Sequence, residues 1–212
     1  MDARRMSAHM APTLFILSPA RCGGERAAVL ATSEVSALGQ ELRAGRAALG
    51  EVFAWLSALY FRGKLTYART FAHAPAGVAA IAVMAPGRGL MHPDQLITAD
   101  ELREMGRIDI ESEAFTGPLR RDAEALDGAT GDATRIVLLG SIASDKYVST
   151  LVDIFGDRLL FPETFVGRGD MSRGGLLLRA ARSGEELTYV PIAGATVRGK
   201  RPPRLPRLRR AT

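Results

Sequence analysis

The amino-acid sequence predicts a single three-layer α/β domain with a mainly parallel sheet. Three short and almost wholly apolar runs, at residues 13–18, 77–84 and 135–139, predict strands. None of them alternates polar and apolar residues, so we expect each strand to be covered on both faces, as in a parallel sheet. Segments with helical character lie between the runs, which is the order of strands joined by crossover helices. We therefore expect the three strands to be parallel neighbours.

The intervening segments give the expected helices and two minor strands. Residues 50–72 have apolar side chains at three- and four-residue spacing, and we expect Gly63 to break or kink this helix. A capping box from Thr98 to Glu101 predicts a short helix that ends near Met105. The other expected elements are helices or mixed segments at 25–40, 118–126 and 145–155, and strands at 158–161 and 187–190.

The charge distribution separates a tail from the domain. The net charge is +5, but residues 198–210 contain seven basic residues and no acidic one, so the rest of the chain carries −2. We expect a disordered leader at 1–12, the α/β domain at 13–195 and a basic, proline-rich tail at 196–212. The tail is a candidate for phosphate contacts with nucleic acid. Two alternatives stay open: a solvated terminus, or a segment that packs onto the domain through Leu205 and Leu208.

Composition narrows the classes of function. The chain has one cysteine, Cys22, and three scattered histidines, so we expect no disulfide, no metal site and no cofactor. No apolar run approaches the length that spans a bilayer, and the first apolar run is too short for the core of a signal peptide. We expect a cytoplasmic protein with no membrane partner.

The loop after the first strand is a candidate anion site. It contains Ser18, Arg21, Gly23 and Gly24, whose guanidinium and backbone N–H groups suit a phosphate or carboxylate. It lacks the Lys-Ser/Thr ending of a Walker loop and the glycine spacing of a dinucleotide fingerprint. The alternative is a tight turn with a solvated arginine. Cys22 follows Arg21, which could lower the pKa of the thiol, although a small loop residue is the better interpretation.

The loops after the second and third strands supply further candidates. In the second, Arg88 lies between two glycines as an anion-binding candidate, and His92 and Asp94 are candidates for general acid–base chemistry. The sequence His-Pro-Asp is equally an ordinary turn. In the third, Ser141 ends the strand before a helix that we expect Ser144 to cap, an arrangement that binds an anion or simply caps the helix.

The segment 165–175 is the most unusual in the chain, with four glycines and two arginines between apolar flanks. We predict a loop that folds over the strand ends. Arg168, Ser172 and Arg173 are its anion-binding candidates, and Asp170 is a candidate base or a partner for one arginine. The alternative is a structural loop with an internal Arg–Asp pair.

The order of these segments resembles a known group of domains. The opening strand with its polar loop is followed by Leu-Tyr-Phe-Arg-Gly-Lys-Leu-Thr-Tyr at 59–67, Pro-Gly-Arg-Gly-Leu-Met-His-Pro-Asp at 86–94 and Ile-Val-Leu-Leu-Gly-Ser at 136–141. This layout, over about residues 13–160, is similar to uncharacterised bacterial domains with a fold like that of uracil-DNA glycosylases, some of them near systems that modify guanine to deazaguanine in DNA. The water-activating motif and the His-Pro-Ser loop of those glycosylases are absent, so no catalytic residue is carried over.

The resemblance implies a nucleobase, nucleotide or nucleic-acid ligand. The leading hypothesis is therefore an enzyme acting on such a ligand, with an Arg/Gly-rich anion site at the carboxyl ends of the strands. The alternatives are a small-molecule enzyme for a phosphorylated or carboxylated substrate and a non-catalytic nucleic-acid-binding module. In each case the expected partner is a small anionic ligand or, through the tail, nucleic acid.

Overall fold

A computed structural model describes residues 11–142, 147–195, 199, 202, 203 and 205. Its centre is a six-stranded sheet in the order β4-β3-β1-β6-β7-β8. The strands are β1 (Thr13–Leu17), β3 (Ile81–Ala85), β4 (Gly89–Met91), β6 (Arg135–Leu139), β7 (Leu159–Pro162) and β8 (Tyr189–Pro191). The domain is a mixed α/β fold, as the sequence predicts.

The three predicted strands are parallel neighbours. β1 lies in the centre and pairs in parallel with β3 on one side and β6 on the other, and β7 continues the parallel order beyond β6. The side chains of β1 are fully buried, which agrees with an apolar run that has no polar alternation. The second strand is shorter than predicted, because residues 77–80 form a turn before β3 begins.

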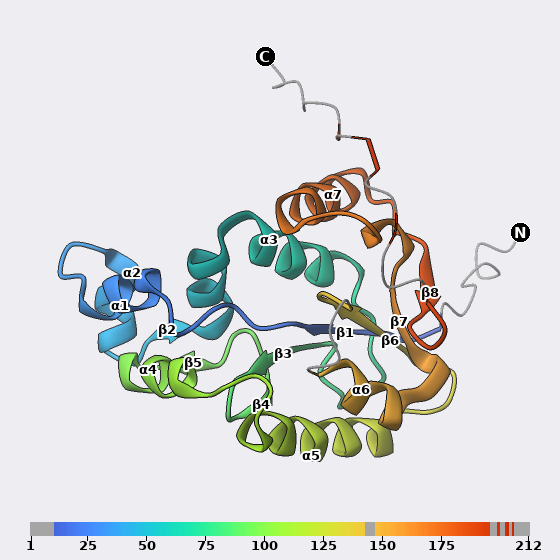
Figure 1. The fold of residues 1–212 in the computed structure, drawn as a ribbon, viewed down its shortest axis with the longest axis horizontal. Coiled ribbons are helices and arrows are strands. Elements are labelled where there is room, and N and C mark those ends of the chain that lie inside the picture. Colours follow the sequence, from blue (N-terminus) through green and yellow to red (C-terminus); the bar gives the residue numbers. More distant parts are fainter. Residues whose placement is uncertain (1–10, 143–146, 196–198, 200–201, 204, 206–212) are drawn as a thin grey trace, which may run out of the picture.

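Helices cover both faces of the sheet. α3 (Leu49–Phe71) and α7 (Asp170–Ser183) pack together on one face, and α5 (Glu113–Ala129) and α6 (Val148–Phe155) pack together on the other (Figure 1). Short 3-10 turns, η1 (Gly156–Arg158) and η2 (Glu163–Phe165), flank β7. Gly156 ends α6 with a positive φ, a conformation that glycine takes readily. No helix among the described residues is long and apolar enough to cross a bilayer.

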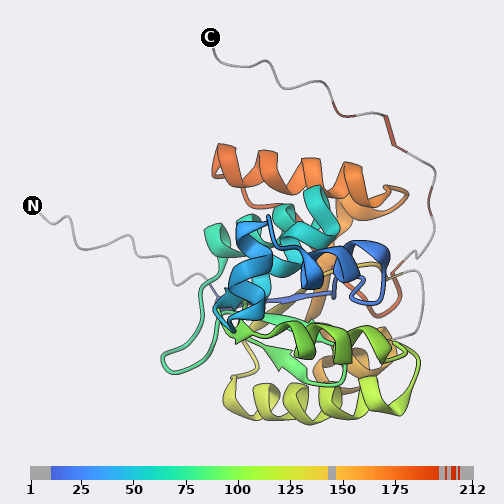
Figure 2. The same cartoon turned by 90° about the vertical axis from the view of Figure 1, so that its left-hand side faces the viewer.

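A second group of elements lies beyond the carboxyl end of β1 (Figures 1 and 2). It contains α1 (Glu25–Thr32), α2 (Ala37–Arg43), α4 (Ala99–Arg107) and a small antiparallel pair, β2 (Ala47–Ala48) with β5 (Leu96–Ile97). The predicted capping box is present at the start of α4, where Thr98 and Glu101 bond each other's backbone N–H groups.

The break in α3 lies at Ala58, five residues before the predicted position. Ala58 has φ 46° and ψ −119°, outside the helical region, and two helical arms meet there. The two arms lie close together. A β-carbon added at Gly50, in the first arm, would be only 3.0 Å from Leu65 Cδ2, in the second. Glycine is the residue that ordinarily takes such a backbone shape, so Ala58 holds strain that Gly63, which is helical, does not.

Replacing Ala58 by glycine should stabilise the protein. Ala58 is exposed, so Ala58→Gly removes no packing. It relieves the strain of a positive φ, and we expect the free energy of unfolding to rise by about 1 kcal/mol. Ala54→Gly, in regular helix of the same α3, should instead cost about 1 kcal/mol. Urea unfolding followed by circular dichroism measures both. A loss of stability in Ala58→Gly comparable to that of Ala54→Gly would contradict the strained turn.

Glycines allow α3 and α7 to approach closely. A β-carbon at Gly63 would lie 2.7 Å from the carbonyl oxygen of Gly174, and one at Gly174 would lie 2.7 Å from that of Leu59. The prediction of a loop within residues 165–175 is wrong from Asp170 onward, because α7 begins at that residue. Of the four glycines in this segment, Gly174 serves the contact between the two helices, whereas Gly167, before the helix, has a positive φ of 71°.

Candidate functional site

The strand order places a topological switch point between β1 and β6. The chain leaves β1 toward β3 on one side, whereas it leaves β6 toward β7 on the other. The two outgoing segments therefore diverge at the carboxyl ends of these adjacent strands, and open α/β sheets bind their ligands in the crevice at this position. The residues there are Ser18 and Gly140, each the first residue after its strand.

A buried lysine reaches this point from α3. Lys64 is 1% exposed, and its Nζ atom donates a hydrogen bond to the carbonyl oxygen of Ser18 at 2.7 Å. The same Nζ atom lies 3.0 Å from Ser18 Oγ. A fully buried lysine is rare in proteins because its charge is costly outside water. Here the backbone carbonyl and the serine hydroxyl supply its polar contacts.

The surroundings of Lys64 favour the neutral amine. Its Nζ atom lies 4.7 Å from the ring centroids of both Tyr60 and Phe61. Burial lowers the pKa of Lys64 to about 7, against a smaller opposite effect of the Asp170 carboxylate. A neutral amine has a free lone pair, so near neutral pH Lys64 can accept a proton from a hydroxyl group within hydrogen-bond reach.

Tyr147, at the residue before α6, closes the cluster on the β6 side. Its hydroxyl donates to the carbonyl oxygen of Ser141 at 3.1 Å and also hydrogen-bonds the Ser18 side chain. Burial raises the pKa of Tyr147, so its hydroxyl stays protonated. A β-carbon at Gly140 would lie 2.9 Å from both this hydroxyl and Ser18 Cβ, so only glycine leaves the two side chains room to meet.

One further polar atom of the cluster, the Tyr60 hydroxyl, has only the poorly aligned Arg173 guanidinium beside it. The Tyr60 hydroxyl is buried and has no hydrogen-bond partner of good geometry among the described residues. Burial raises its pKa, and the nearby Arg173 guanidinium only partly offsets that effect. A buried hydroxyl without a partner is unfavourable, so this atom is available to a bound ligand. Ser18, Lys64, Tyr147 and Tyr60 together are called the switch-point cluster below.

The first predicted loop adjoins this cluster but uses its glycines for packing. A β-carbon at Gly23 would lie 2.5 Å from the Gly106 carbonyl oxygen, so Gly23 allows α4 to approach the loop. Gly24 is the N-cap of α1. Burial raises the pKa of the Cys22 thiol to about 12, and the expectation of a lowered pKa is wrong because desolvation outweighs any effect of the neighbouring arginine.

Arg21 is the arginine of this loop that stays available. Its side chain is exposed and makes no hydrogen bond or ion pair with any residue that the structure describes. It lines a pocket of about 460 Å³, whose wall also includes Pro19, the residue after Ser18, and Pro86, the residue after β3. The predicted anion site at the carboxyl ends of the strands thus retains one free guanidinium group.

Of the candidates in the second loop, Arg88 lies in the turn after β3 but is already paired, and His92 and Asp94 lie elsewhere. Arg88 already pairs with the carboxylates of Glu101 (3.1 Å) and Glu104 (2.8 Å). His92 and Asp94 do not lie at the carboxyl end of β3, because β4 is antiparallel to β3 and carries the chain back along the sheet. Asp94 forms an exposed ion pair with Arg69 and bonds the His92 imidazole through its backbone N–H at 3.2 Å.

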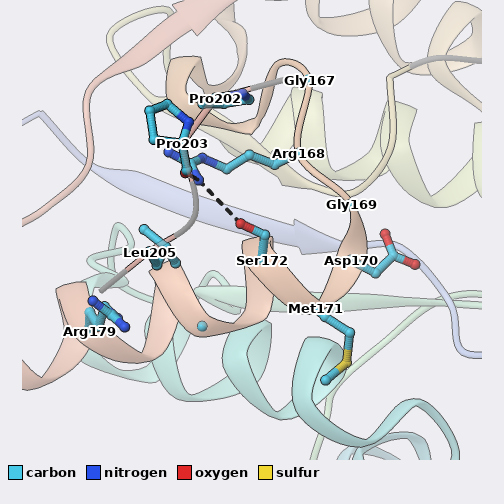
Figure 3. Close-up of a pocket in the computed structure, with 11 residues that line it drawn as sticks. Gly167, Arg168, Gly169, Asp170, Met171, Ser172, Arg179, Pro202, Pro203 and Leu205 are labelled. Atoms are coloured by element: carbon cyan, nitrogen blue, oxygen red, sulfur yellow. Dashed lines mark hydrogen bonds between the residues drawn. The ribbon is translucent and has the colours of Figure 1, made fainter. Parts of the chain in front are cut away.

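The structure also separates His92 from Arg168, which lies just before α7. Arg168 donates to the Thr164 carbonyl at 3.0 Å, the Ser172 hydroxyl at 3.2 Å and the Pro203 carbonyl at 3.4 Å, and Figure 3 shows it reaching between the last two residues. It lines a pocket of about 720 Å³ together with Asp170, Arg179 and Leu205, whereas His92 lines a different one. The two predicted groups therefore do not form one site.

Arg173 holds α7 to the preceding segment. Its guanidinium donates twice to the Phe165 carbonyl, at 3.2 and 3.3 Å, and lies over the Phe165 ring. Asp170 is 3.8 Å away and exposed. Arg173 also lies near Tyr60, so this arginine and Asp170 contribute charge to the switch-point cluster from α7.

Among the other predictions, Ser144 and most of the tail lie outside the described residues, and Leu205 lies beside Gly175 on α7.

Lys64, Tyr60 and Tyr147 were not among the sequence-predicted site residues. The available signal was a lysine on the apolar face of a helix, four residues from both Tyr60 and Ala68, which are buried. Among the described residues no group of three or more His, Cys, Asp or Glu side chains is placed to hold a metal ion. The groups that the site offers are an amine, hydroxyls and a guanidinium.

Fold and site together define an open α/β domain with a polar cluster at its switch point. A scan against protein-family models, a search of the curated proteins and a search of the solved structures each found no match to this chain. The function is therefore inferred from the geometry of the site.

Proposed function

We propose that this protein is an enzyme acting on a nucleobase, nucleotide or nucleic acid that binds at the carboxyl ends of β1 and β6. The observation that carries the proposal is the switch-point cluster, in which Lys64 and Ser18 meet where ligands of open α/β sheets bind. Buried ionisable groups with strongly shifted pKa values gather at active sites. The choice of substrate class is supported by the layout that resembles the glycosylase-like domains.

Two features give the proposed substrate its contacts. The free Arg21 guanidinium, in the pocket that begins at Pro19, suits a phosphate group. The Tyr60 and Tyr147 hydroxyls suit the polar edge of a base. Both sets of groups lie at the same end of the sheet, so one ligand with an anionic part and a hydrogen-bonding part would use both.

The proposal is tested with a panel of ligands. The panel contains the common nucleobases, their nucleoside monophosphates and a short single-stranded DNA, with glucose 6-phosphate and citrate as a contrasting set. We expect a member of the first set to raise the melting temperature and to be converted, as seen by chromatography, over hours. Tyr147→Phe should weaken its binding by roughly tenfold, since it removes one buried hydrogen-bonding group.

Tyr67→Phe is the matched control. Tyr67 is also buried and hydrogen-bonded. It lies on α3 about one turn after Lys64, where it packs against Phe15 and away from the strand ends. Its variant should bind the ligand as the wild type does. Binding of only the contrasting set would instead identify an enzyme of small phosphorylated or carboxylated substrates. Binding of the DNA alone, unchanged in Tyr147→Phe and without product, would identify a non-catalytic module.

A further inference from the structure

We propose that Ser18 and Lys64 form a nucleophile–base pair for acyl transfer, with Ser18 Oγ attacking an ester or amide carbonyl of the substrate and Lys64 Nζ taking the hydroxyl proton. This inference rests on the proposed function, since it names the reaction at the same site. Serine–lysine pairs are one of the forms that activated serine nucleophiles take.

The geometry meets the requirements for such a pair. Nucleophile and base must lie within hydrogen-bond reach, and a third group must orient the base. Ser18 Oγ and Lys64 Nζ are 3.0 Å apart, and the Ser18 carbonyl, 2.7 Å from Nζ, fixes the amine. A neutral amine donates one N–H to that carbonyl, and its lone pair accepts the serine proton once the hydroxyl turns from Tyr147 to Nζ.

The neighbouring groups keep the amine in the required state. The titratable and charged groups around it are Tyr60 on its own helix, Asp170 and Arg173 on α7, and Tyr147 before α6. The Asp170 carboxylate and the face of the Tyr60 ring favour the ammonium form, and the effect of Asp170 is smaller than that of burial. Tyr147 bonds the serine side chain on the β6 side. If its single O–H turns from the Ser141 carbonyl to the substrate, Tyr147 donates to the oxygen that gains charge during the attack.

The reaction balances without a further reagent. A bond forms between Ser18 Oγ and the carbonyl carbon, and the bond from that carbon to the leaving group breaks. The serine proton passes to Lys64 Nζ and then to the leaving group, which departs with the bonding electron pair. Water then gives a proton to Lys64 Nζ and bonds to the acyl carbon. The bond from that carbon to Ser18 Oγ breaks, Oγ takes the proton back from Lys64, and the acid is released.

The experiment uses p-nitrophenyl acetate and the full-length protein. Transfer of its acetyl group to Ser18 releases p-nitrophenol in a burst of about one equivalent per chain, and peptide mass spectrometry after an acid quench locates the acetyl group. Ser18→Ala should abolish the burst. Lys64→Met should slow it by about 10²–10⁴-fold, the usual contribution of a general base. Ser183→Ala, at the far end of α7, is the control and should react as the wild type does.

The pH dependence of the wild-type burst rate tests the proposal even if a variant fails to fold. The burst rate should rise as Lys64 loses its proton, with a midpoint near pH 7. Acetylation of Lys64 instead of Ser18, a rate unchanged in Lys64→Met, or the absence of any acetyl-Ser18 between pH 6 and 9 would each overturn the pair. In the last case Lys64 only anchors the end of β1. Acetyl-Ser18 in a protein that binds no member of the nucleotide panel would retain the pair and reject the proposed substrate class.

Discussion

Between pH 7 and pH 9.5, the free energy of unfolding of the wild type should rise relative to that of Lys64→Met. The pKa of Lys64 is about 7 in the fold and 10.5 in the unfolded chain. Below pH 7 both states hold the proton, and the cost of the buried charge is fully present. As the pH rises, the folded state loses the proton while the unfolded state keeps it, so the difference in stability grows by about 1.4 kcal/mol per pH unit.

The comparison with Lys64→Met isolates this one group. The Cys22 thiol, whose pKa is raised to about 12, acts in the opposite direction above about pH 9, because only the unfolded chain then loses that proton. The buried tyrosines act in the same way at still higher pH, and all these effects are common to both proteins. Urea unfolding at half-unit pH steps measures the difference. Parallel stability curves for the two proteins would mean that Lys64 keeps an ordinary pKa and is hydrated.

Gly174→Ala should be among the most damaging single-methyl additions in the protein. Its β-carbon would meet the Leu59 carbonyl oxygen at 2.7 Å and the Tyr60 Cα atom at 2.9 Å, and neither backbone atom can move without shifting α3. We expect a loss of about 2–3 kcal/mol, or roughly 5–10 °C in melting temperature. Because Tyr60 belongs to the switch-point cluster, the same shift should also reduce acylation of Ser18.

The adjacent glycine is the control. A β-carbon at Gly175 would meet only Leu205 Cδ1, at 3.6 Å, which is an ordinary contact. Gly175→Ala should therefore gain about 0.5–1 kcal/mol from helix propensity. Scanning calorimetry of both variants gives the comparison. Equal effects of the two substitutions would exclude the close contact between α3 and α7.

The sheet could be predicted from the sequence because its signal is local. Residues 136–139 form a continuous apolar run after Arg135, and the structure has β6 over 135–139 with every position after Arg135 buried. A run of this kind fits only a strand covered on both faces, and parallel order follows from the helices between the runs. The sequence places Ser18 in the loop after the first strand, and in the structure Ser18 directly follows β1.

The rest of the site depends on contacts between distant segments. Lys64 and Ser18 are 46 residues apart, and a lysine in a helix is ordinarily read as solvated. Gly174 has no local property that distinguishes a helix contact from a loop. The turn before β4 was also missed: positive φ angles at Gly87 and Gly89 allow a tight reversal, and this reversal moves His92 away from the strand ends.

The two outermost strands have a consequence for how the protein behaves at high concentration. β4 has three residues and is antiparallel to β3, and β8 has three residues, ends at Pro191 and is antiparallel to β7. A long, regular edge would offer a row of unpaired backbone groups to the sheet of another molecule. Short strands, and a proline that has no N–H to donate, leave little for a neighbouring chain to extend. The parallel core, which could otherwise template growth from either side, is thereby protected against edge-to-edge aggregation.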